Sequence, residues 1–277
     1  MKWIEWLDKI RFMNVKVWDF SVRSMLRQYG WKFMTHVILR HPVKTLIGIS
    51  EYRKEGSQDK RGDCLTTVPR NLEQWRGGGN SIVGVGFCLK PIDPVCVSGR
   101  ANHNCFFFER NLHIADKTIP ECCKGCSIRS IGLLALQAGC RFYIMTSARD
   151  ILYDVLLPGI NDNTYANGLF VICRYSFEPF KVALLISGIK GYLFPYQIGD
   201  CRDYTSWLSA DIGVKDEQTE VAGENCSAIK EILRQSEDSD SMEWKCEKVG
   251  NIFDVQSEKE ERLGGSLALP ALAKLGG

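Results

Sequence analysis

The chain has 277 residues, of which 45% are hydrophobic and 25% charged, and its net charge is +2. This ordinary globular composition is enough for one large core or two small ones. No apolar run reaches the ~18 uninterrupted residues of a membrane span, which argues against a membrane-spanning protein. Twelve cysteines follow an N-terminus without the features of a signal peptide. We therefore expect a cytoplasmic, reducing setting, in which thiols bind metals or do redox chemistry.

Residues 1–62 are predicted to form a basic, tryptophan-rich helical extension. Residues 1–61 carry 13 Lys and Arg against 6 Asp and Glu, and four of the seven tryptophans lie in the first 31 residues. Apolar side chains recur there at helical spacing, and the polar stretch 51–62 is typical of a linker. Two interpretations stay open: residues 1–30 contact a membrane surface, or their rings pack on the main domain or a partner subunit.

Residues 63–225 are predicted to form a cysteine-rich α/β core. The stretch 81–87 is typical of a short strand, and its glycines are not spaced as a dinucleotide fingerprint. A turn-rich loop follows it. Phe106-Phe107-Phe108 indicates either the start of a buried strand or a shield over a site. The cysteines of this region are Cys88, Cys96 and Cys105.

The segment Glu121–Ser127 places three cysteines, Cys122, Cys123 and Cys126, within five residues at the start of a predicted helix over 127–138. A helix N-terminus stabilises anionic sulfur, and Gly125 suits a tight turn. Thiolates suit iron–sulfur clusters, zinc and copper(I). The single Cys-x-x-Cys also fits a zinc knuckle or a redox dithiol, but the second Cys-x-x-Cys of many zinc sites is missing. We interpret the turn as one arm of an iron–sulfur centre.

The remainder of the core alternates strands and helices, which favours a small parallel sheet with flanking helices and right-handed crossovers. Ser147 opens a helix with a pattern like a capping box, and Pro195 is predicted to stop the last strand. The predicted elements are strand 141–146, a helix from Ser147 to Pro158, strand 168–173, a helix from Pro179 to Gly188 and strand 190–194.

Two further cysteines are expected at one edge of this sheet. Cys173 ends its strand and Cys201 lies in the loop after the next strand. Ligands of open α/β sheets bind at the carboxyl ends of the strands. We expect the Cys123–Cys126 turn to lean over the same edge, where nearby Arg129, Arg174 and Arg202 would offset the charge of a cluster. Cys140 is expected to be core, and Cys64, Cys226 and Cys246 are expected to be free.

The C-terminal part divides into an acidic flexible linker, 226–262, and an apolar docking segment, 263–277. A short helix is predicted over 224–234, and residues 202–262 carry 8 Lys and Arg against 16 Asp and Glu. The Gly-Ser-Leu of residues 265–267 resembles the cargo-loading peptides that dock into encapsulin shells or bacterial microcompartments. The resemblance implies docking to a protein shell. A cloning scar and a helix on the core are the alternatives.

Several of these motifs, in this order, resemble the cysteine-rich domain-of-unknown-function family one hundred and sixteen. They are Phe87-Cys88-Leu-Lys-Pro, Cys96, Cys123-x-x-Cys126-Ser-Ile-x-x-Ile-Gly132, Ala138-Gly, Val171-Ile-Cys173 and Gly199-Asp-Cys201. The resemblance covers roughly residues 81–207. It implies that Cys88, Cys96, Cys123, Cys126, Cys173 and Cys201 bind iron–sulfur clusters, with no established reaction. The chain departs from the pattern by having Cys105 and Cys122 as well, which leaves the number of clusters open.

The sequence thus predicts an iron–sulfur protein that transfers electrons or serves a partner enzyme as a redox accessory. Four thiolates hold one [4Fe–4S] cluster, and eight candidates could hold two. The alternatives are an enzyme with an open iron site and a zinc-stabilised assembly scaffold. For an enzyme, the acid/base candidates are Asp200, Asp203, Glu178 and His103. The expected partner is a redox protein or a larger complex, and no nucleic acid. The candidate ligands are Cys88, Cys96, Cys105, Cys122, Cys123, Cys126, Cys173 and Cys201.

Overall fold

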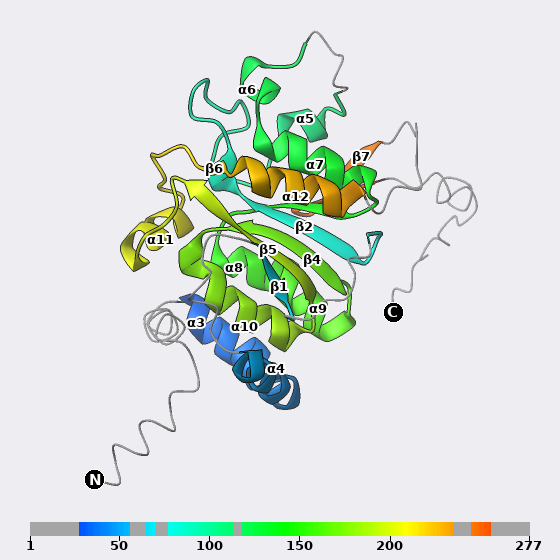
Figure 1. The fold of residues 1–277 in the computed structure, drawn as a ribbon, viewed down its shortest axis with the longest axis vertical. Helices are drawn as coiled ribbons and strands as arrows, with labels where there is room; N and C mark the ends of the chain where they lie inside the picture. Colours follow the sequence, from blue (N-terminus) through cyan, green and yellow to red (C-terminus); the bar gives the residue numbers. More distant parts are fainter. Residues whose placement is uncertain (1–27, 56–64, 70–76, 113–117, 235–244, 256–277) are drawn as a thin grey trace, which may run out of the picture.

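A mixed β-sheet forms the centre of the molecule (Figure 1). The structure is a computed structural model, and it describes residues 28–55, 65–69, 77–112, 118–234 and 245–255. Within these ranges the sheet runs in the order β1-β5-β4-β2-β3-β8-β7, and β6 pairs with β5. The strands are β1 (Thr66–Val68), β2 (Ser81–Gly86), β3 (Arg141–Met145), β4 (Asn167–Ile172), β5 (Lys190–Ile198), β6 (Glu220–Val221), β7 (Cys246–Val249) and β8 (Ile252–Val255).

The four central strands are parallel, and the strands at both edges are antiparallel. β2 pairs in parallel with β3 on one side and with β4 on the other, and β4 pairs in parallel with β5. β1 and β6 run antiparallel to β5, and β8 runs antiparallel to β3. The predicted α/β class is therefore confirmed. The sheet is larger than expected and mixed in direction, because a C-terminal hairpin and two short strands extend it.

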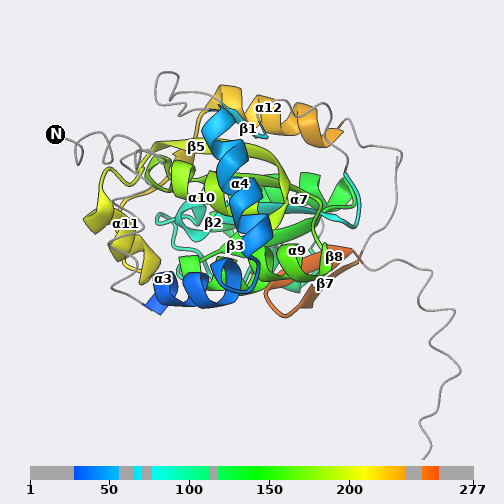
Figure 2. The same cartoon turned by 90° about the horizontal axis from the view of Figure 1, so that it is seen from below.

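Two helical layers cover the sheet, one on each face (Figure 2). Side chains of a strand alternate between faces, so in β4 Leu169 and Val171 pack in one core and Phe170 and Ile172 in the other. The first core includes α7 (Ser127–Gln137) and α12 (Gly223–Arg234). The second includes α4 (Pro42–Glu55), α9 (Leu157–Asp162) and α10 (Phe177–Ser187). Both faces of the central strands are buried, as is usual for parallel sheets.

The shorter helices lie around the ends of the strands. α3 (Gln28–Phe33) runs through a π-helical turn (Met34–Ile38) toward α4, and α8 (Ala148–Ile151) continues through Leu152–Leu156 into α9. α5 (Phe106–Glu109) and α6 (Glu121–Lys124) lie in the connection between β2 and α7, and α11 (Tyr204–Asp211) follows β5. The 3-10 turns are Phe87–Leu89 and Arg174–Ser176.

Most elements predicted from periodicity are present within a few residues of the expected bounds. These are β2, α7, β3, β4, α10 and α12. The helix that begins at Ala148 does not stop at Pro158 but continues to Asp162, and α9, with Pro158 as its second residue, follows directly on the π-helical turn Leu152–Leu156. It ends at Asn163, which has the left-handed backbone conformation of a helix cap (φ 51°).

One local prediction was wrong, and so was one of the two interpretations of Phe106–Phe108. Pro195 does not stop β5, which continues to Ile198. On the outer side of β5, β1 pairs with residues up to Leu193 and β6 pairs with residues from Tyr196 onward. Pro195 lies in the gap between these two strands, so on that side no hydrogen bond is lost through its missing N–H. Phe106–Phe108 begins a short helix and not a strand. Phe107 and Phe108 are buried, and Phe108 packs on Phe142 and Phe253.

The domain bounds also differ from the prediction. Residues 28–55 are part of the folded body: Tyr52 is buried and donates a hydrogen bond to Glu178 of α10, and Lys44 donates to the carbonyl of Ile160. Part of the expected acidic linker is folded as well, because residues 246–255 form the β7–β8 hairpin. Residues 226–234 of that linker lie in α12. Residues 1–27 of the predicted extension, Cys64, linker residues 235–244 and 256–262 and the docking segment 263–277 lie outside the described residues.

The helices of the described ranges are too short or too polar to cross a lipid bilayer.

Replacing Gly132 with alanine is expected to lower the free energy of unfolding by about 1–3 kcal/mol, because it overpacks the core. A Cβ atom at Gly132 would lie 2.5 Å from the ring of Phe108 and 2.8 Å from that of Phe142. Gly125 is the matched control, since a Cβ there meets nothing within 4 Å and its φ is −104°. Urea unfolding of Gly132→Ala and Gly125→Ala tests this, and equal midpoints would contradict it.

Candidate metal centre

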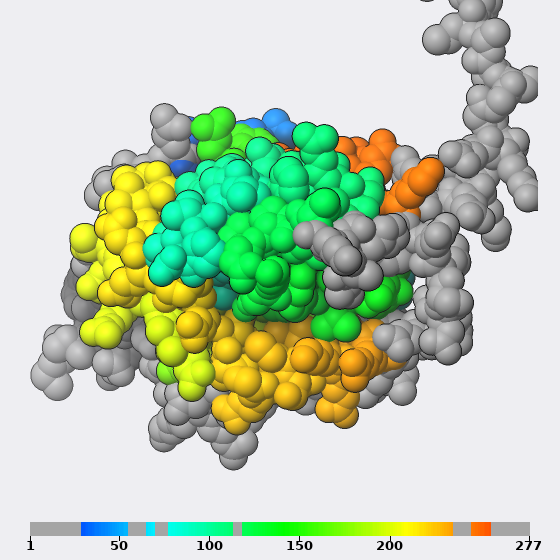
Figure 3. Space-filling view, turned by 90° about the horizontal axis from the view of Figure 1, so that it is seen from above, coloured from blue at the N-terminus to red at the C-terminus, as the bar shows by residue number. Residues whose placement is uncertain are grey.

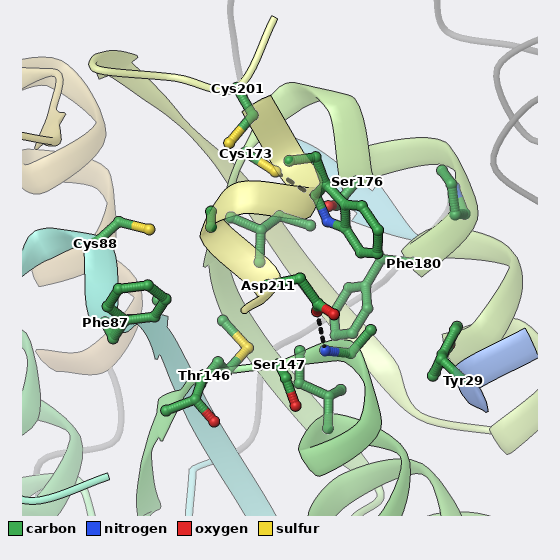
Figure 4. Close-up of a pocket in the computed structure, with 18 of the residues that line it drawn as sticks. Tyr29, Phe87, Cys88, Thr146, Ser147, Cys173, Ser176, Phe180, Cys201 and Asp211 are labelled. Carbon is green, nitrogen blue, oxygen red and sulfur yellow. Dashed lines mark hydrogen bonds between the residues drawn. The ribbon is translucent and has the colours of Figure 1, made fainter. Parts of the chain in front are cut away.

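Three cysteines, which we call the edge thiols, lie at the carboxyl ends of the parallel strands. Cys88 lies in the turn after β2, Cys173 follows the last residue of β4, and Cys201 lies in the loop after β5. Figure 4 shows the sulfurs of Cys173 and Cys201 close together, with the side chain of Cys88 directed toward them from the facing side. All three are buried, with exposures of 5–9%. The predicted meeting of Cys173 and Cys201 at one sheet edge is therefore observed, and Cys88 joins them.

The edge thiols influence one another's ionisation. The hydrogen bond between Cys173 and Cys201 raises the pKa of Cys173 well above its usual value and lowers the pKa of Cys201, because the pair shares a proton. Burial raises the pKa of Cys88 to about 12. The Sγ atom of Cys173 also lies 3.0 Å from the hydroxyl oxygen of Ser176. Within the pair, Cys201 therefore ionises before Cys173.

Five other cysteines, which we call the loop thiols, gather in the connection between β2 and α7. Their sulfurs act on one another electrostatically: Cys105 with Cys126 and Cys96, Cys126 with Cys96 and Cys122, and Cys123 with Cys122, Cys105 and Cys126. The sulfurs of Cys122 and Cys123 are 3.9 Å apart. In Figure 3 the teal and green atoms of this part of the chain form the centre of one face.

Two of the loop thiols are placed by helix starts. Cys105 precedes α5 and Cys126 precedes α7, and each has the extended backbone of an N-cap residue. Burial raises the pKa of Cys105 to about 12, and it also raises that of Cys126. The backbone N–H groups of residues 107 and 108, and of 128 and 129, face these two sulfurs and lower the pKa values in part. Such N–H groups favour an anionic sulfur and would support a metal-bound thiolate.

A buried lysine lies beside the loop thiols. Lys90 is 1% exposed, and its ammonium donates to the carbonyl oxygens of Gly99 and Asn102 and to the side-chain oxygen of Asn102, at 2.9, 2.9 and 2.7 Å. Burial lowers the pKa of Lys90 to about 8, and the nearby Cys96, Cys105 and Glu109 act in the opposite direction when they are ionised. All three acceptors are neutral, so the folded loop holds a buried cation that anionic sulfur would complement.

The edge thiols also have cationic neighbours. Arg100 and Lys215 both lower the pKa of Cys88, and Lys215 lowers that of Cys201. One guanidinium nitrogen of Arg100 donates to the carbonyl of Cys88 at 3.3 Å, another donates to the carbonyl of Lys215, and its buried Nε has no hydrogen-bond partner. The sequence did not indicate these cations, because Arg100 and Lys215 lie 12 and 14 residues from the nearest edge thiol in the chain.

The arginines named from the sequence have other contacts. Arg129 donates to the carbonyl of Lys124 and lies over the ring of Phe107, near the loop thiols. Arg174 forms an ion pair with Asp200 at 3.7 Å. Cys140 is fully buried in the first core, as predicted, and Cys226 is partly buried. Cys226 and Cys246 are free of disulfide bonds, as expected; Cys246 is buried, and burial raises its pKa to about 12.

The acid/base candidates have structural roles. Asp203 caps α11, and Asp200 accepts from the backbone N–H groups of Arg174 and Cys201. His103 lies 2.7 Å from the carbonyl oxygen of Ile144, which requires a proton on Nδ1, and its Nε2 lies 3.0 Å from Thr146 Oγ1. Glu178 accepts from Tyr52. None of these four lines the cavity described next.

A cavity of about 100 Å³ opens beside the edge thiols (Figure 4). The three sulfur-bearing side chains lie at one end and Tyr29 of α3 at the other. Between them the walls are mostly apolar. They include Met145, Ile151, Phe180, Ala183, Trp207 and Ala210. The sequence gave no sign of this cavity, because its walls come from seven separate stretches of the chain.

Within the described residues, no three His, Cys, Asp or Glu side chains stand close enough together to hold one metal ion. An iron–sulfur cluster requires a different arrangement of thiolates. Each thiolate binds a separate iron, so the sulfurs are spaced around the cluster and do not meet at one point. The five loop thiols beside a buried lysine fit this requirement in donor type and charge. The edge thiols fit it less well, because Cys173 and Cys201 are hydrogen-bonded to each other. The cysteines therefore divide into two sets. The Cys123–Cys126 turn was expected at the same sheet edge as Cys173 and Cys201, but it belongs to the other set.

The protein without metal is expected to lose stability as the pH rises above about 9. Cys88 and Cys105 have a usual pKa of 9.0 that burial raises to about 12. Between pH 9 and 12 both thiols are still protonated in the folded protein but are ionised in the unfolded protein. The stabilisation of the folded state by these two protonated thiols is complete below pH 9. It falls between pH 9 and 12, by up to about 1.4 kcal/mol of unfolding free energy per pH unit for each thiol. Urea unfolding at a series of pH values measures this, and Cys88→Ala should reduce the slope. A flat profile would contradict it.

Comparisons of the chain with protein families, with curated proteins and with solved structures find no match.

Proposed function

We propose that the loop thiols hold a [4Fe–4S] cluster and that the chain exchanges electrons with a partner protein. The observation that carries this proposal is the buried Lys90, whose three hydrogen bonds all go to neutral oxygen atoms beside Cys96 and Cys105. A cluster bound by four thiolates carries net negative charge. It would keep Lys90 protonated and would supply the anion that a buried ammonium needs.

The number and placing of the loop thiols support the same proposal. Four thiolates complete a [4Fe–4S] cluster, and five are present. Cys122 and Cys123 are adjacent in α6, so we assign one of them to the cluster together with Cys96, Cys105 and Cys126. The backbone N–H groups that face Cys105 and Cys126 would raise the potential of a cluster, as hydrogen bonds to cluster sulfurs do.

A redox partner has a place to dock beside this site. Cys96 is only partly buried. Its neighbours Val95 and Val97 are 67% and 55% exposed. Exposed apolar side chains next to a redox centre suit a weak, transient protein contact. The membrane-surface contact of residues 1–30 and the shell docking of residues 263–277 remain proposals about segments outside the described residues.

Anaerobic purification with metal and sulfide analysis tests this function. We expect iron and acid-labile sulfide in equal amounts, a brown protein, and an EPR signal after reduction with dithionite. Zinc in stoichiometric amount in a colourless protein would overturn the proposal and favour the zinc-stabilised scaffold. Iron that dithionite cannot reduce, and that never exchanges electrons with a low-potential mediator, would refute the electron-transfer role while leaving the cluster in place.

A further inference from the structure

Two hydrogen-bonded thiols lie at the point of the sheet where ligands of open α/β folds bind. β2 and β4 are neighbours, and the chain leaves them in opposite directions, because β2 connects through α7 to β3 and β4 through α10 to β5. α7 and α10 pack in different cores, on opposite faces of the sheet. The crevice between the carboxyl ends of two such strands is the usual ligand site. Cys173 and Cys201 follow β4 and β5 at this edge.

We propose that Cys173 and Cys201 form a redox dithiol that reduces small, uncharged, apolar disulfides bound in the cavity. Both side chains line the cavity, and Figure 4 shows their sulfurs close together at one end of it. Neither cysteine is in a disulfide, so the pair is present in its reduced form. This inference does not use the loop cluster, and it stands or fails independently of the proposed function.

The hydrogen bond within the pair gives the two thiols different roles. Cys173 donates and Cys201 accepts, which lowers the pKa of Cys201, and Lys215 lowers it as well. The thiolate is the form that attacks a disulfide, so Cys201 is the nucleophile. Cys173 keeps its proton and already lies beside the sulfur atom that it attacks in the second step. This proximity favours closure of the pair over release of a mixed disulfide.

The reaction has two steps, and each exchanges one sulfur–sulfur bond for another. The Cys201 thiolate attacks one sulfur of the bound disulfide RSSR, which forms a mixed disulfide on Cys201 and releases RS⁻. The sulfur of Cys173 then attacks Cys201 Sγ, which forms the Cys173–Cys201 bond and releases the second RS⁻. One RS⁻ takes the proton of Cys173, and the other takes from solvent the proton that Cys201 had lost. The protein pair thus loses two electrons, the substrate becomes two molecules of RSH, and an external dithiol restores the pair by the reverse exchange.

Two neighbours of the pair support this division of roles. The hydroxyl of Ser176 lies 3.0 Å from the sulfur of Cys173, where it donates to that sulfur as the thiol loses its proton. Cys88 lies on the facing side, and burial raises its pKa to about 12. Cys88 therefore stays protonated at neutral pH and does not replace Cys201 as the nucleophile.

The polar groups of the cavity favour a disulfide over a hydroperoxide as the oxidant. Thr146 and Ser147 donate to Asp150, at 2.5 and 2.8 Å, and Asp211 accepts from the backbone N–H of Ala148 at 2.6 Å. These groups are engaged within the protein, so they do not serve the substrate. An alkoxide that leaves a hydroperoxide needs a proton donor, whereas a thiolate is a stable leaving group without one.

The size and the walls of the cavity narrow the substrate further. A cavity of about 100 Å³ is smaller than the ~150 Å³ that accommodates benzene, so a bound disulfide has only a few non-hydrogen atoms. Met145, Ile151 and Phe180 line the cavity and favour alkyl groups on the two sulfurs. Asp211 disfavours an anionic substrate. The substrate class is therefore the short dialkyl disulfides.

Peptide mapping of the unchanged chain tests the site without any substitution. The protein is reduced with dithiothreitol, freed of it under anaerobic conditions and treated with dimethyl disulfide. We expect a linked pair of peptides that contain Cys173 and Cys201, and two molecules of methanethiol for each link formed. The disulfide of 2-mercaptoethanesulfonate is longer and charged, and it should form this link at least about tenfold more slowly. Absence of the link, or equal rates with the two probes, would overturn the proposal.

Serine substitutions separate the roles of the two thiols. Cys173→Ser should stop after the first step, with a methylthio group on Cys201 and one molecule of methanethiol released. Cys201→Ser should leave Cys173 unmodified. Cys226 of α12 does not line the cavity, and Cys226→Ala should form the Cys173–Cys201 link at the unchanged rate. A methylthio group on Cys173 in place of Cys201 would refute the assigned roles.

A pair of matched substitutions tests whether the substrate occupies the cavity. Ala210 of α11 lines the cavity, and Ala228 of α12 does not. Ala210→Leu should slow formation of the Cys173–Cys201 link by dimethyl disulfide at least about tenfold, and Ala228→Leu should leave the rate unchanged. Equal rates in the two variants would mean that the disulfide reaches the pair by another route, which would overturn the assignment of the cavity.

Discussion

Replacing Cys126 with alanine is expected to remove nearly all of the iron and sulfide, from about four irons per chain. Cys126 is the thiol that joins the Cys-x-x-Cys turn to α7, and the N–H groups of residues 128 and 129 face its sulfur. Cys122 and Cys123 both lie in α6, four and three residues before it, so neither can take its position at the helix start. Iron and sulfide analysis of anaerobically purified protein measures the loss.

Cys140→Ala is the matched control for this substitution. Cys140 is fully buried, as Cys126 nearly is, and packs in the first core, and its thiol donates a weak hydrogen bond to the carbonyl of Ala138. The Cys140→Ala variant should be less stable than the unchanged protein but should keep its iron. If both variants lose the same amount of iron, the loss at Cys126 reflects unfolding, and the assignment of this thiol fails.

Replacing Lys90 with methionine is expected to lower the free energy of unfolding by about 3 kcal/mol. The substitution keeps the apolar stem and leaves the oxygens of Gly99 and Asn102 without their charged donor. These oxygens belong to the loop that carries Cys96 and leads to Cys105. The loop cluster should therefore be more labile to oxygen, and its reduction potential should fall, because a nearby positive charge is lost.

Lys190→Met provides the comparison for Lys90→Met. Lys190 is exposed at the start of β5. Its substitution should therefore change the free energy of unfolding by less than about 0.5 kcal/mol and leave the reduction potential of the cluster unchanged. Urea unfolding and a redox titration followed by EPR give both quantities. An unchanged potential in Lys90→Met would mean that the cluster does not lie beside this lysine.

The α/β class and the position of the strand-end cysteines could be predicted from the sequence, for a local reason. β4 is a continuous apolar run that ends directly at Cys173, and the glycine that ends α10 adopts the left-handed conformation (φ 75°) that its position suggested. Patterns of this kind involve only a few neighbouring residues, so they can be recognised in the sequence without knowledge of the fold. Cys201 follows the next strand, and the rule for strand ends brings the two together.

The division into two thiol sets could not be predicted, because it depends on contacts between distant segments. Cys88 follows β2 directly and joins the edge thiols, whereas Cys96 and Cys105, from the same loop, join the turn at Cys122–Cys126. In the sequence Cys88, Cys96 and Cys105 simply follow one another within one turn-rich region, and nothing separates Cys88 from the other two. Lys90 was missed for the same reason: it is an ordinary lysine in the sequence, and only the folded loop buries it against oxygens 9 and 12 residues away.

The C-terminal hairpin was missed because its strands are short and polar. Residues 246–255 carry alternating charges, and β7 has only one buried residue, Cys246. Phe253 is fully buried and packs on Phe108 and Phe142, which attaches the hairpin to the sheet through β3. One aromatic side chain in an acidic stretch is too weak a pattern to predict a strand.

The central claim is that the loop thiols hold one iron–sulfur cluster. The iron content of three proteins tests it most directly: the unchanged chain, Cys126→Ala and Cys173→Ala. The account predicts about four irons per chain in the unchanged protein, almost none in Cys126→Ala and unchanged iron in Cys173→Ala. Unchanged iron in Cys126→Ala, or loss of the iron in Cys173→Ala, would contradict it.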